Sequence, residues 1–182
     1  MSRVPYISRD DLPPDGKVAY DRFEQTRGYV SDAFKALFNH PRTAEAVASF
    51  GEYVRYNSTL DPTIRETAIL AAARELNSQY EWTHHEPVAR KAGVRDEVIQ
   101  AIRDRRAPWG LPPKEGVWVR YAQELIRNHK VTEATHEAIV HLIGAQGAID
   151  LAVTIGYFLM LSHLLAALEV ELEEDLTPLL PE

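Results

Sequence analysis

The densest group of ionisable side chains in the sequence comprises Glu81, His84, His85 and Glu86. On a helix, Glu81 and His85 are four residues apart, so their side chains share one face and can touch. A carboxylate beside an imidazole raises the pKa of the imidazole toward neutrality or above, which suits a general acid or base. An ordinary surface ion pair has the same spacing, and spacing alone favours that interpretation.

A further carboxylate, Glu66, lies upstream in a segment that is rich in alanine and has little room for charge. Arg65 and Arg74 are available to pair with it, so a simple salt bridge explains its presence. The functional interpretation is that Glu66 points toward the start of the following helix, where Glu81 and His85 lie. These residues alone leave both interpretations open.

Cysteine is absent from the 182 residues. This excludes disulfide bonds, thiolate zinc sites and any cysteine nucleophile or redox pair. A metal site made by Glu81, His84, His85 and Glu86 is an alternative, because ligands at positions i and i+4 share a helix face. The cluster lacks the His-Glu-x-x-His order of zinc peptidases, so we predict no metal site.

The chain is acidic, with 20 Lys and Arg against 27 Asp and Glu and a formal net charge of -7. This balance disfavours binding to nucleic acid or to an anionic membrane surface. A chain of this length with 45% hydrophobic and 26% charged residues is typical of one globular domain with a sizeable core. The first fifteen residues lack the apolar stretch of a secretory signal, so we expect a soluble, cytoplasmic protein.

One apolar segment, Leu151 to Leu168, has the minimum length for a membrane span. It is interrupted by Thr154, Ser162 and His163, follows Asp150, and has no basic flanking residues. We therefore expect a buried central helix, or a helix that packs against another subunit.

The apolar residues recur at helical spacing along nearly the whole chain. The Asp61-Pro62 pair predicts a helix start, because Asp61 can cap free amides and proline suits the first helical position. Gly144 and Gly147 predict a break before the long apolar segment, and residues 103–113 read as a loop. No strand pattern is present, so the predicted fold is all-α. The expected helices are 15–27, 31–38, 41–56, 62–76, 80–92, 94–103, 114–128, 132–143 and 151–168.

A set of segments in a fixed order along the chain carries a family resemblance: Phe34–Pro41, Leu60–Leu70, Tyr80–His85 with Ala89, Gly93 and Val94, Ile155–Phe158 and Leu164–Val170. Together they resemble the carboxymuconolactone decarboxylase family, whose superfamily also contains the alkylhydroperoxidase D-like proteins. The resemblance implies an alkylhydroperoxidase D-like helical bundle, one domain over residues 1–182 with residues 1–14 as an N-terminal arm, and a homo-oligomer, either a trimer or a hexamer.

The peroxidase branch of this family has a glutamate, a Cys-x-x-Cys pair and a histidine four residues after the second cysteine. Counting back from His85 places Ser78 and Glu81 at the two cysteine positions and Glu66 at the upstream glutamate. Peroxide reduction by that route needs both thiols, so this chain cannot perform it. The decarboxylase branch has a glutamate and a histidine four residues apart, which Glu81 and His85 match.

The resemblance thus implies acid–base catalysis by Glu66, Glu81 and His85, without a metal or an organic cofactor. Loss of carbon dioxide from an unsaturated lactone acid requires a group that accepts the electron pair of the broken bond, and the lactone itself can do this. It also requires a proton donor, because a carbon of the product must be protonated. His85, held by Glu81, would supply the proton, and Glu66 would orient the imidazole. The substrate carboxylates also need a cation. The candidates are Arg65, Arg74 and Arg90.

The predicted function is therefore that of a cofactor-independent lyase acting on a small organic acid or lactone. One alternative is an oxidoreductase or antioxidant role of the alkylhydroperoxidase D-like type, with peroxiredoxin activity but without cysteine chemistry. Another is a non-catalytic binding or scaffold protein. We expect neither nucleic-acid nor membrane partners, and we expect the apolar surface of residues 151–168 to support a homo-oligomer.

Overall fold

The computed structural model describes residues 2–181 and contains helices, turns and loops but no strand in that range. The prediction of an all-α fold is confirmed. The described residues form two compact units, one of residues 2–57 and 163–176 and the other of residues 58–162 and 177–181. The single domain expected over residues 1–182 stays a prediction.

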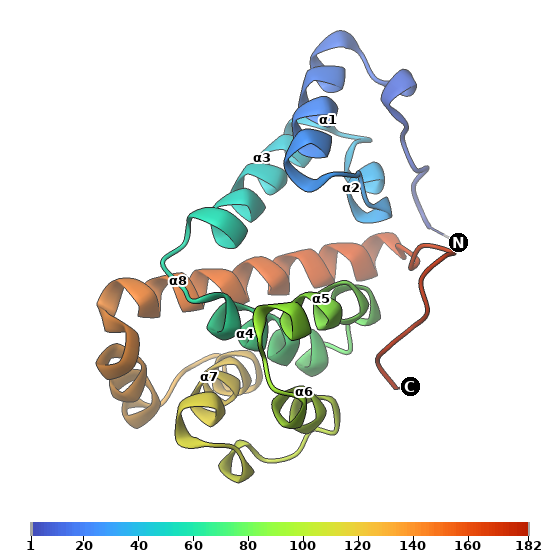
Figure 1. Cartoon of the computed structure of the whole chain (residues 1–182). Helices are drawn as coiled ribbons and strands as arrows, with labels where there is room; N and C mark the ends of the chain where they lie inside the picture. Colours follow the sequence, from blue (N-terminus) through green and yellow to red (C-terminus); the bar gives the residue numbers. More distant parts are fainter. Residues whose placement is uncertain (1, 182) are drawn as a thin grey trace. The chain divides into compact units, whose positions relative to one another are not determined.

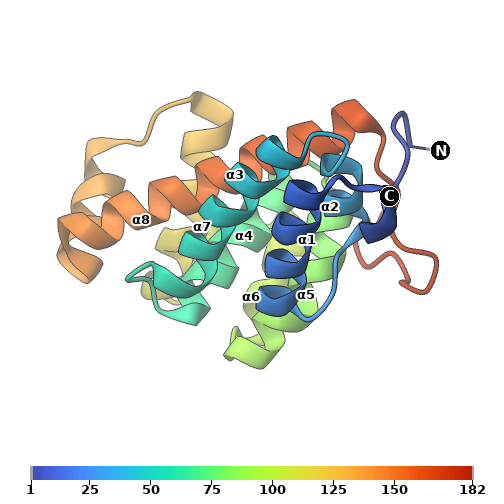
Figure 2. The ribbon, with the colours of Figure 1, turned by 90° about the horizontal axis from the view of Figure 1, so that it is seen from above.

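The first unit contains α1 (Pro14–Arg27), α2 (Asp32–Leu37) and α3 (Pro41–Glu52), preceded by the short turn η1 (Arg9–Asp11). Helix α1 packs along α3, and both views show the pair side by side (Figures 1 and 2). Aromatic rings fill the interior: the centroids of Phe23 and Phe34 are 4.0 Å apart, and those of Tyr20 and Phe38 are 5.0 Å apart. The helix expected over 41–56 changes after Glu52 into a π-helical turn, η2 (Tyr53–Asn57).

The second unit is built around α4 (Pro62–Glu75), which packs against α5 (Gln79–Ala92), α6 (Asp96–Arg103) and α7 (Pro113–Asn128) (Figures 1 and 2). Every residue from Ala68 to Ala73 in α4 is buried. A helix enclosed on several sides needs an apolar surface all round, and the alanines let neighbouring helices approach closely.

The local signals at the ends of α4 and α5 act as predicted. The Asp61 carboxylate accepts a hydrogen bond of 2.8 Å from the backbone N–H of Thr63, and Pro62 is the first residue of α4. Gly93 ends α5 in the left-handed region, with φ of 93°. These two boundaries fix the residues of α4 and α5 that face each other.

Helix α8 (Glu133–Leu168) joins two helical segments across Gly144, where φ is 72° and ψ is 173°. The predicted break is confirmed at this glycine. Gly147 is required at the same bend, because a Cβ there would lie 2.8 Å from the Cβ of Ile143. The turn η3 (Pro108–Gly110) lies in the predicted loop.

The apolar part of α8 is long and hydrophobic enough for a membrane span by length and composition, a test that the core helix of a globular protein also passes. Leu151, Ile155 and Phe158 are buried, whereas Ile149 and Met160 are exposed. The buried helix expected over residues 151–168 is therefore covered along one side only.

Candidate functional site

The three predicted catalytic residues meet inside the second unit. Nδ1 of His85 lies 2.8 Å from Oε2 of Glu66, and Nε2 of His85 lies 3.8 Å from Oε2 of Glu81. All three are buried: His85 is 0% exposed, Glu66 is 2% exposed and Glu81 is 3% exposed. The interpretation of Glu81 and His85 as a surface ion pair, which the spacing alone favoured, is therefore wrong, because the cluster is buried.

The two helices that pack most closely in this unit supply the three residues. Glu66 lies on the first full turn of α4 after Pro62, and Glu81 and His85 lie one helical turn apart on α5. Ser78 is the N-cap residue of α5, but its side chain makes no capping hydrogen bond.

The geometry specifies how the imidazole of His85 can hold its protons. When Glu66 is ionised it only accepts hydrogen bonds, so the close contact requires Nδ1 of His85 to donate. In neutral His85, Nε2 then carries the lone pair, on the side that faces Glu81. The separation of 3.8 Å from the Glu81 carboxylate is too long for a direct hydrogen bond. His85 can therefore exchange a proton at Nε2 while Glu66 holds its orientation.

The structure selects one of the three candidate arginines. Nε of Arg65 lies 3.3 Å from Oε1 of Glu66, and the Arg65 side chain is 15% exposed. Arg65 thus connects the buried carboxylate to the accessible surface. A guanidinium at this position is close enough to the cluster to bind an anionic substrate group.

The side chains of the other two candidate arginines bind partners outside the cluster. Arg74 donates through Nε to the backbone carbonyl of Arg103 at 2.7 Å. Arg90 forms ion pairs with Glu86 and Asp96 near the C-terminal end of α5. Neither is placed in contact with the Glu66–His85–Glu81 cluster.

Helix α8 contributes a contact to the site that the sequence analysis did not assign. The ring of Phe158 meets the His85 imidazole edge-on, with centroids 4.8 Å apart and planes at 83°. Thr154 lies one turn earlier on α8, fully buried, and its hydroxyl has no hydrogen-bond partner. The sequence signal was only a threonine in an apolar segment, which does not indicate what the side chain faces.

The alternative of a metal site receives no support. Among residues 2–181, no group of three or more His, Asp or Glu side chains is arranged to hold a metal ion. The ring of His84 stacks on Tyr80, with centroids 4.5 Å apart. Glu86 accepts a hydrogen bond of 2.7 Å from Arg90. The four residues considered as ligands therefore face different partners.

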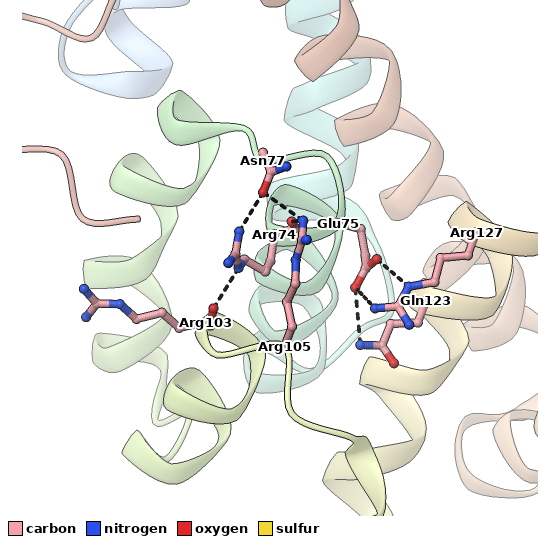
Figure 3. Close-up of polar contacts among 7 residues, drawn as sticks. All are labelled: Arg74, Glu75, Asn77, Arg103, Arg105, Gln123 and Arg127. Atoms are coloured by element: carbon pink, nitrogen blue, oxygen red, sulfur yellow. Dashed lines mark hydrogen bonds and ion pairs between the residues drawn. The ribbon is translucent and has the colours of Figure 1, made fainter. Parts of the chain in front are cut away.

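A second polar cluster lies at the C-terminal end of α4 (Figure 3). Arg74 and Arg105 both donate to Oδ1 of Asn77, at 2.6 and 2.8 Å. Arg127 donates to both oxygens of the Glu75 carboxylate at 2.6 Å, and Gln123 adds a contact of 3.3 Å. This network ties α4 to α7 and to the end of α6.

The overall fold is that of the alkylhydroperoxidase D-like proteins. An alkylhydroperoxidase core from Ralstonia eutropha JMP134, an uncharacterized peroxidase-related protein, has a TM-score of 0.78 at 19% identity, covering 96% of this chain and 93% of that chain. A peroxidase-related protein from Silicibacter sp. TM1040 has a TM-score of 0.76 at 18% identity, covering 94% and 91%. The debrominase Bmp8, as a cysteine-to-alanine variant in complex with 2,3,4-tribromopyrrole, has a TM-score of 0.76 at 14% identity, covering 94% and 91%.

Residues 41–124 match the carboxymuconolactone decarboxylase family, and this range includes Glu66, Glu81 and His85. The resemblance to this family, recognised from the sequence, is confirmed over these residues. No curated protein matches the sequence significantly. The fold and the family resemblance of residues 41–124 are therefore confirmed, whereas the reaction is the subject of a proposal.

Proposed function

We propose that the protein is a cofactor-independent acid–base catalyst, a lyase that acts on a small organic acid or lactone. The observation that carries this proposal is the buried cluster of one imidazole and two carboxylates, with Glu66 2.8 Å from one ring nitrogen of His85. Buried ionisable groups are costly to maintain, and they concentrate at functional sites.

His85 is the proposed proton donor and acceptor. As the bond to the leaving carboxylate breaks, its electron pair moves into the unsaturated lactone, and carbon dioxide is released. For this step His85 starts as the imidazolium, protonated on both ring nitrogens. A carbon of the resulting enolate takes the Nε2 proton, which leaves the neutral ring with its lone pair on Nε2, and a proton from water then restores the imidazolium. Glu66 holds the ring through Nδ1, and Glu81 stabilises the imidazolium that forms when His85 is reprotonated.

Two neighbouring groups support a binding position beside the imidazole. Arg65 offers a cation for a substrate carboxylate, and its Nε already contacts Glu66. The unpartnered hydroxyl of Thr154 can donate to or accept from a bound molecule, because it lies one turn from Phe158, which packs on His85.

The alternative oxidoreductase role would have to proceed without cysteine, since the chain has none. One of the structurally similar proteins is a debrominase studied with a brominated pyrrole. A brominated aromatic acid therefore belongs in the substrate panel together with lactones, keto acids and peroxides. The binding or scaffold alternative predicts that no member of this panel is turned over.

The test compares wild type with His85→Gln on this panel, with product formation and carbon dioxide release as the readouts. We expect at least one lactone or organic acid to be turned over by wild type, and kcat/KM to fall by about 10²- to 10⁴-fold in the variant. Arg127→Gln is the matched control, because Arg127 belongs to the second polar cluster. Turnover that survives in His85→Gln would overturn the assignment.

We also propose that the protein forms a homo-oligomer. The support is an apolar stripe on α8 in which Ile149 and Met160 are exposed and Val153, between them, is half-buried. Light scattering after size exclusion measures the mass directly. Monomers at micromolar concentration would contradict the proposal.

A further inference from the structure

Two adjoining clefts lie in the second unit, away from the Glu66–His85–Glu81 cluster. The apolar cleft, of about 480 Å³, lies between η3, α7 and the first segment of α8, and its apolar wall includes Leu111, Val117 and Leu142. The basic cleft, of about 450 Å³, is lined by residues that include Arg105, Arg106 and Arg127. Pro108 and Arg120 line both clefts, so the two adjoin at these residues, and we refer to them together as the groove.

A close approach of backbone shapes the apolar cleft. A Cβ on Gly116 would lie only 2.6 Å from the backbone oxygen of Pro108, so glycine allows η3 to pack against α7. The loop that follows Arg103-Asp104-Arg105-Arg106 is held at this position. The arginine-rich loop, which plays no part in the proposed reaction, thereby lines the groove.

The charge of the groove is opposite to that of the whole chain, which carries a net charge of -7. Lys114, Arg120 and His141 line the apolar cleft, whereas no Asp or Glu is among the side chains that line it. Lys114 and His141 are exposed and make no hydrogen bond or ion pair with the part of the chain that the structure describes. An anion entering this cleft would therefore meet the ammonium group of Lys114, which no carboxylate of the described residues neutralises.

The basic cleft includes one carboxylate, Glu124, which is occupied by internal hydrogen bonds. Thr132 donates to it through its backbone N–H at 2.8 Å and its hydroxyl at 3.0 Å, and Thr135 donates at 2.9 Å. Burial raises the pKa of Glu124, but these hydrogen bonds and nearby Arg120 outweigh burial, so the pKa lies below its ordinary value. Glu124 thus serves the junction of α7 and α8. Arg127 and Arg106 of the basic cleft are paired with Glu75 and Asp104, so the cationic side chains closest to the apolar cleft are Lys114 and Arg120, which line it.

We propose that this groove binds an amphiphilic carboxylate, with its apolar body in the apolar cleft and its carboxylate at Arg120, where the clefts meet. A cleft of about 480 Å³ is within the usual range for sites that bind small molecules. Such sites combine apolar walls with a few polar groups that set orientation. The groove contains no residue of the proposed catalytic cluster, so this inference is independent of the proposed function.

The test is calorimetric titration of the full chain with three probes: decanoate, decan-1-ol and acetate. We expect decanoate to bind with one site per chain, decan-1-ol to bind at least tenfold more weakly, and acetate to show no binding. The alcohol measures the contribution of the apolar cleft alone, and acetate measures that of the cations alone. Equal affinity for decanoate and decan-1-ol would overturn the role of charge.

Matched variants locate the binding site. Leu142, in the apolar cleft, and Leu176, outside it, are both 37% exposed. We expect Leu142→Asp to lower the affinity for decanoate at least tenfold and Leu176→Asp to leave it within twofold of wild type. Weaker binding of decanoate in Lys114→Gln, but not in Lys91→Gln, would support the contribution of the Lys114 ammonium group.

A second variant keeps the test decisive if Leu142→Asp does not fold. Ala138→Leu adds apolar volume inside the apolar cleft, so it should exclude the alkyl chain while leaving the fold intact. Unchanged decanoate binding in Ala138→Leu would overturn the proposal. So would absence of decanoate binding together with a change of oligomeric state in Leu142→Asp, because the groove would then be a contact between copies of the chain.

Discussion

The two ends of α4 carry charged side chains in opposite ways. Near its start, Glu66 is buried with His85 and Arg65, in a cluster with two carboxylates around one imidazole. At its end, Glu75 and Asn77 accept hydrogen bonds from arginines that reach the surface (Figure 3). The cluster at the end of α4 consists of paired donors and acceptors that join neighbouring helices. The cluster at the start of α4 buries titratable side chains away from water.

The difference indicates which cluster is structural and which is a candidate site. The Glu75 side chain is 7% exposed, but its partner Arg127 is 50% exposed, so water screens that pair. Burial, together with nearby Arg105, lowers the pKa of Arg74, yet an arginine remains charged at any physiological pH. The network at the end of α4 contains no side chain whose ordinary pKa lies near neutrality, whereas the cluster at its start contains the imidazole of His85.

The largest expected effect is on stability at the start of α4. Glu66→Ala leaves the buried His85 and Arg65 without their shared acceptor, and removing one partner of a buried pair costs about 3–5 kcal/mol. Urea unfolding followed by circular dichroism measures this loss. Glu66→Gln is the control, because its amide oxygen still accepts from His85. The comparison fails if Glu66→Ala is no less stable than Glu75→Ala.

The second prediction separates activity from stability at the same position. In Glu66→Gln the ring of His85 keeps a hydrogen bond but loses the negative charge that stabilises the imidazolium. On any substrate found in the panel, we expect kcat to fall by about 10²-fold, at the lower end of acid–base effects. The matched variant Glu75→Gln should retain wild-type kcat. If Glu66→Gln and Glu75→Gln had equal kcat values, both clusters would serve the fold and neither would serve catalysis.

The third prediction concerns the strength of the network at the end of α4. Glu75→Ala removes the acceptor of Arg127 and Gln123, and hydrogen bonds to charged groups contribute about 1.5–3 kcal/mol. Solvent exposure of Arg127 reduces this, so we expect a loss of about 1.5 kcal/mol. Thermal and urea unfolding of the variant measure it. A loss above that of Glu66→Ala would reverse the comparison.

A smaller effect is expected at Asn77, which has φ of +50° and accepts from two arginines. Asn77→Ala loses both hydrogen bonds and replaces asparagine, which tolerates the left-handed region, by alanine, which tolerates it less well, at a cost of about 1 kcal/mol. Asn77→Gly loses the same hydrogen bonds but relieves the backbone strain, so it should be the more stable of the two variants. Equal unfolding midpoints would show that backbone strain contributes nothing at this turn.

The smallest effect is a pH dependence at the N-cap of α4. The Thr63 hydroxyl and backbone N–H lower the pKa of Asp61, so its stabilisation is present above the unfolded-state pKa of about 4 and is lost as the pH falls through the folded-state pKa. Asp61→Asn keeps a capping oxygen but loses the charge at the helix N-terminus. At pH 7 we expect it to be about 0.5 kcal/mol less stable, since Asp61 is exposed and screened. Unfolding curves at pH 7 and pH 2.5 should show this gap closing.

Short-range signals in the sequence predicted most of the helices. Asp61-Pro62 starts α4, Gly93 ends α5, and Gly144 breaks α8, because each depends on the backbone geometry of a few consecutive residues. The i, i+4 spacing also predicted that Glu81 and His85 share a face of one helix. The change to a π-helical turn after Glu52 had no comparable local signal.

Contacts between distant segments were beyond this kind of prediction. The sequence proposed three arginines as anion binders, and only packing selected Arg65, because Arg74 and Arg90 have equally suitable side chains but different neighbours. Phe158 reaches His85 from a helix more than seventy positions away in the sequence. The groove beside Arg120 likewise exists only where η3, α7 and α8 meet.

By itself, the amino-acid sequence determined that the chain is helical, where most helices begin and end, that thiol chemistry is absent, and which titratable residues share a helix face. Helix periodicity, capping and composition are properties of neighbouring residues, so they can be read without coordinates. Only the tertiary structure decided that Glu66 joins His85 out of contact with water, since the energy of a charge depends on what surrounds it in space.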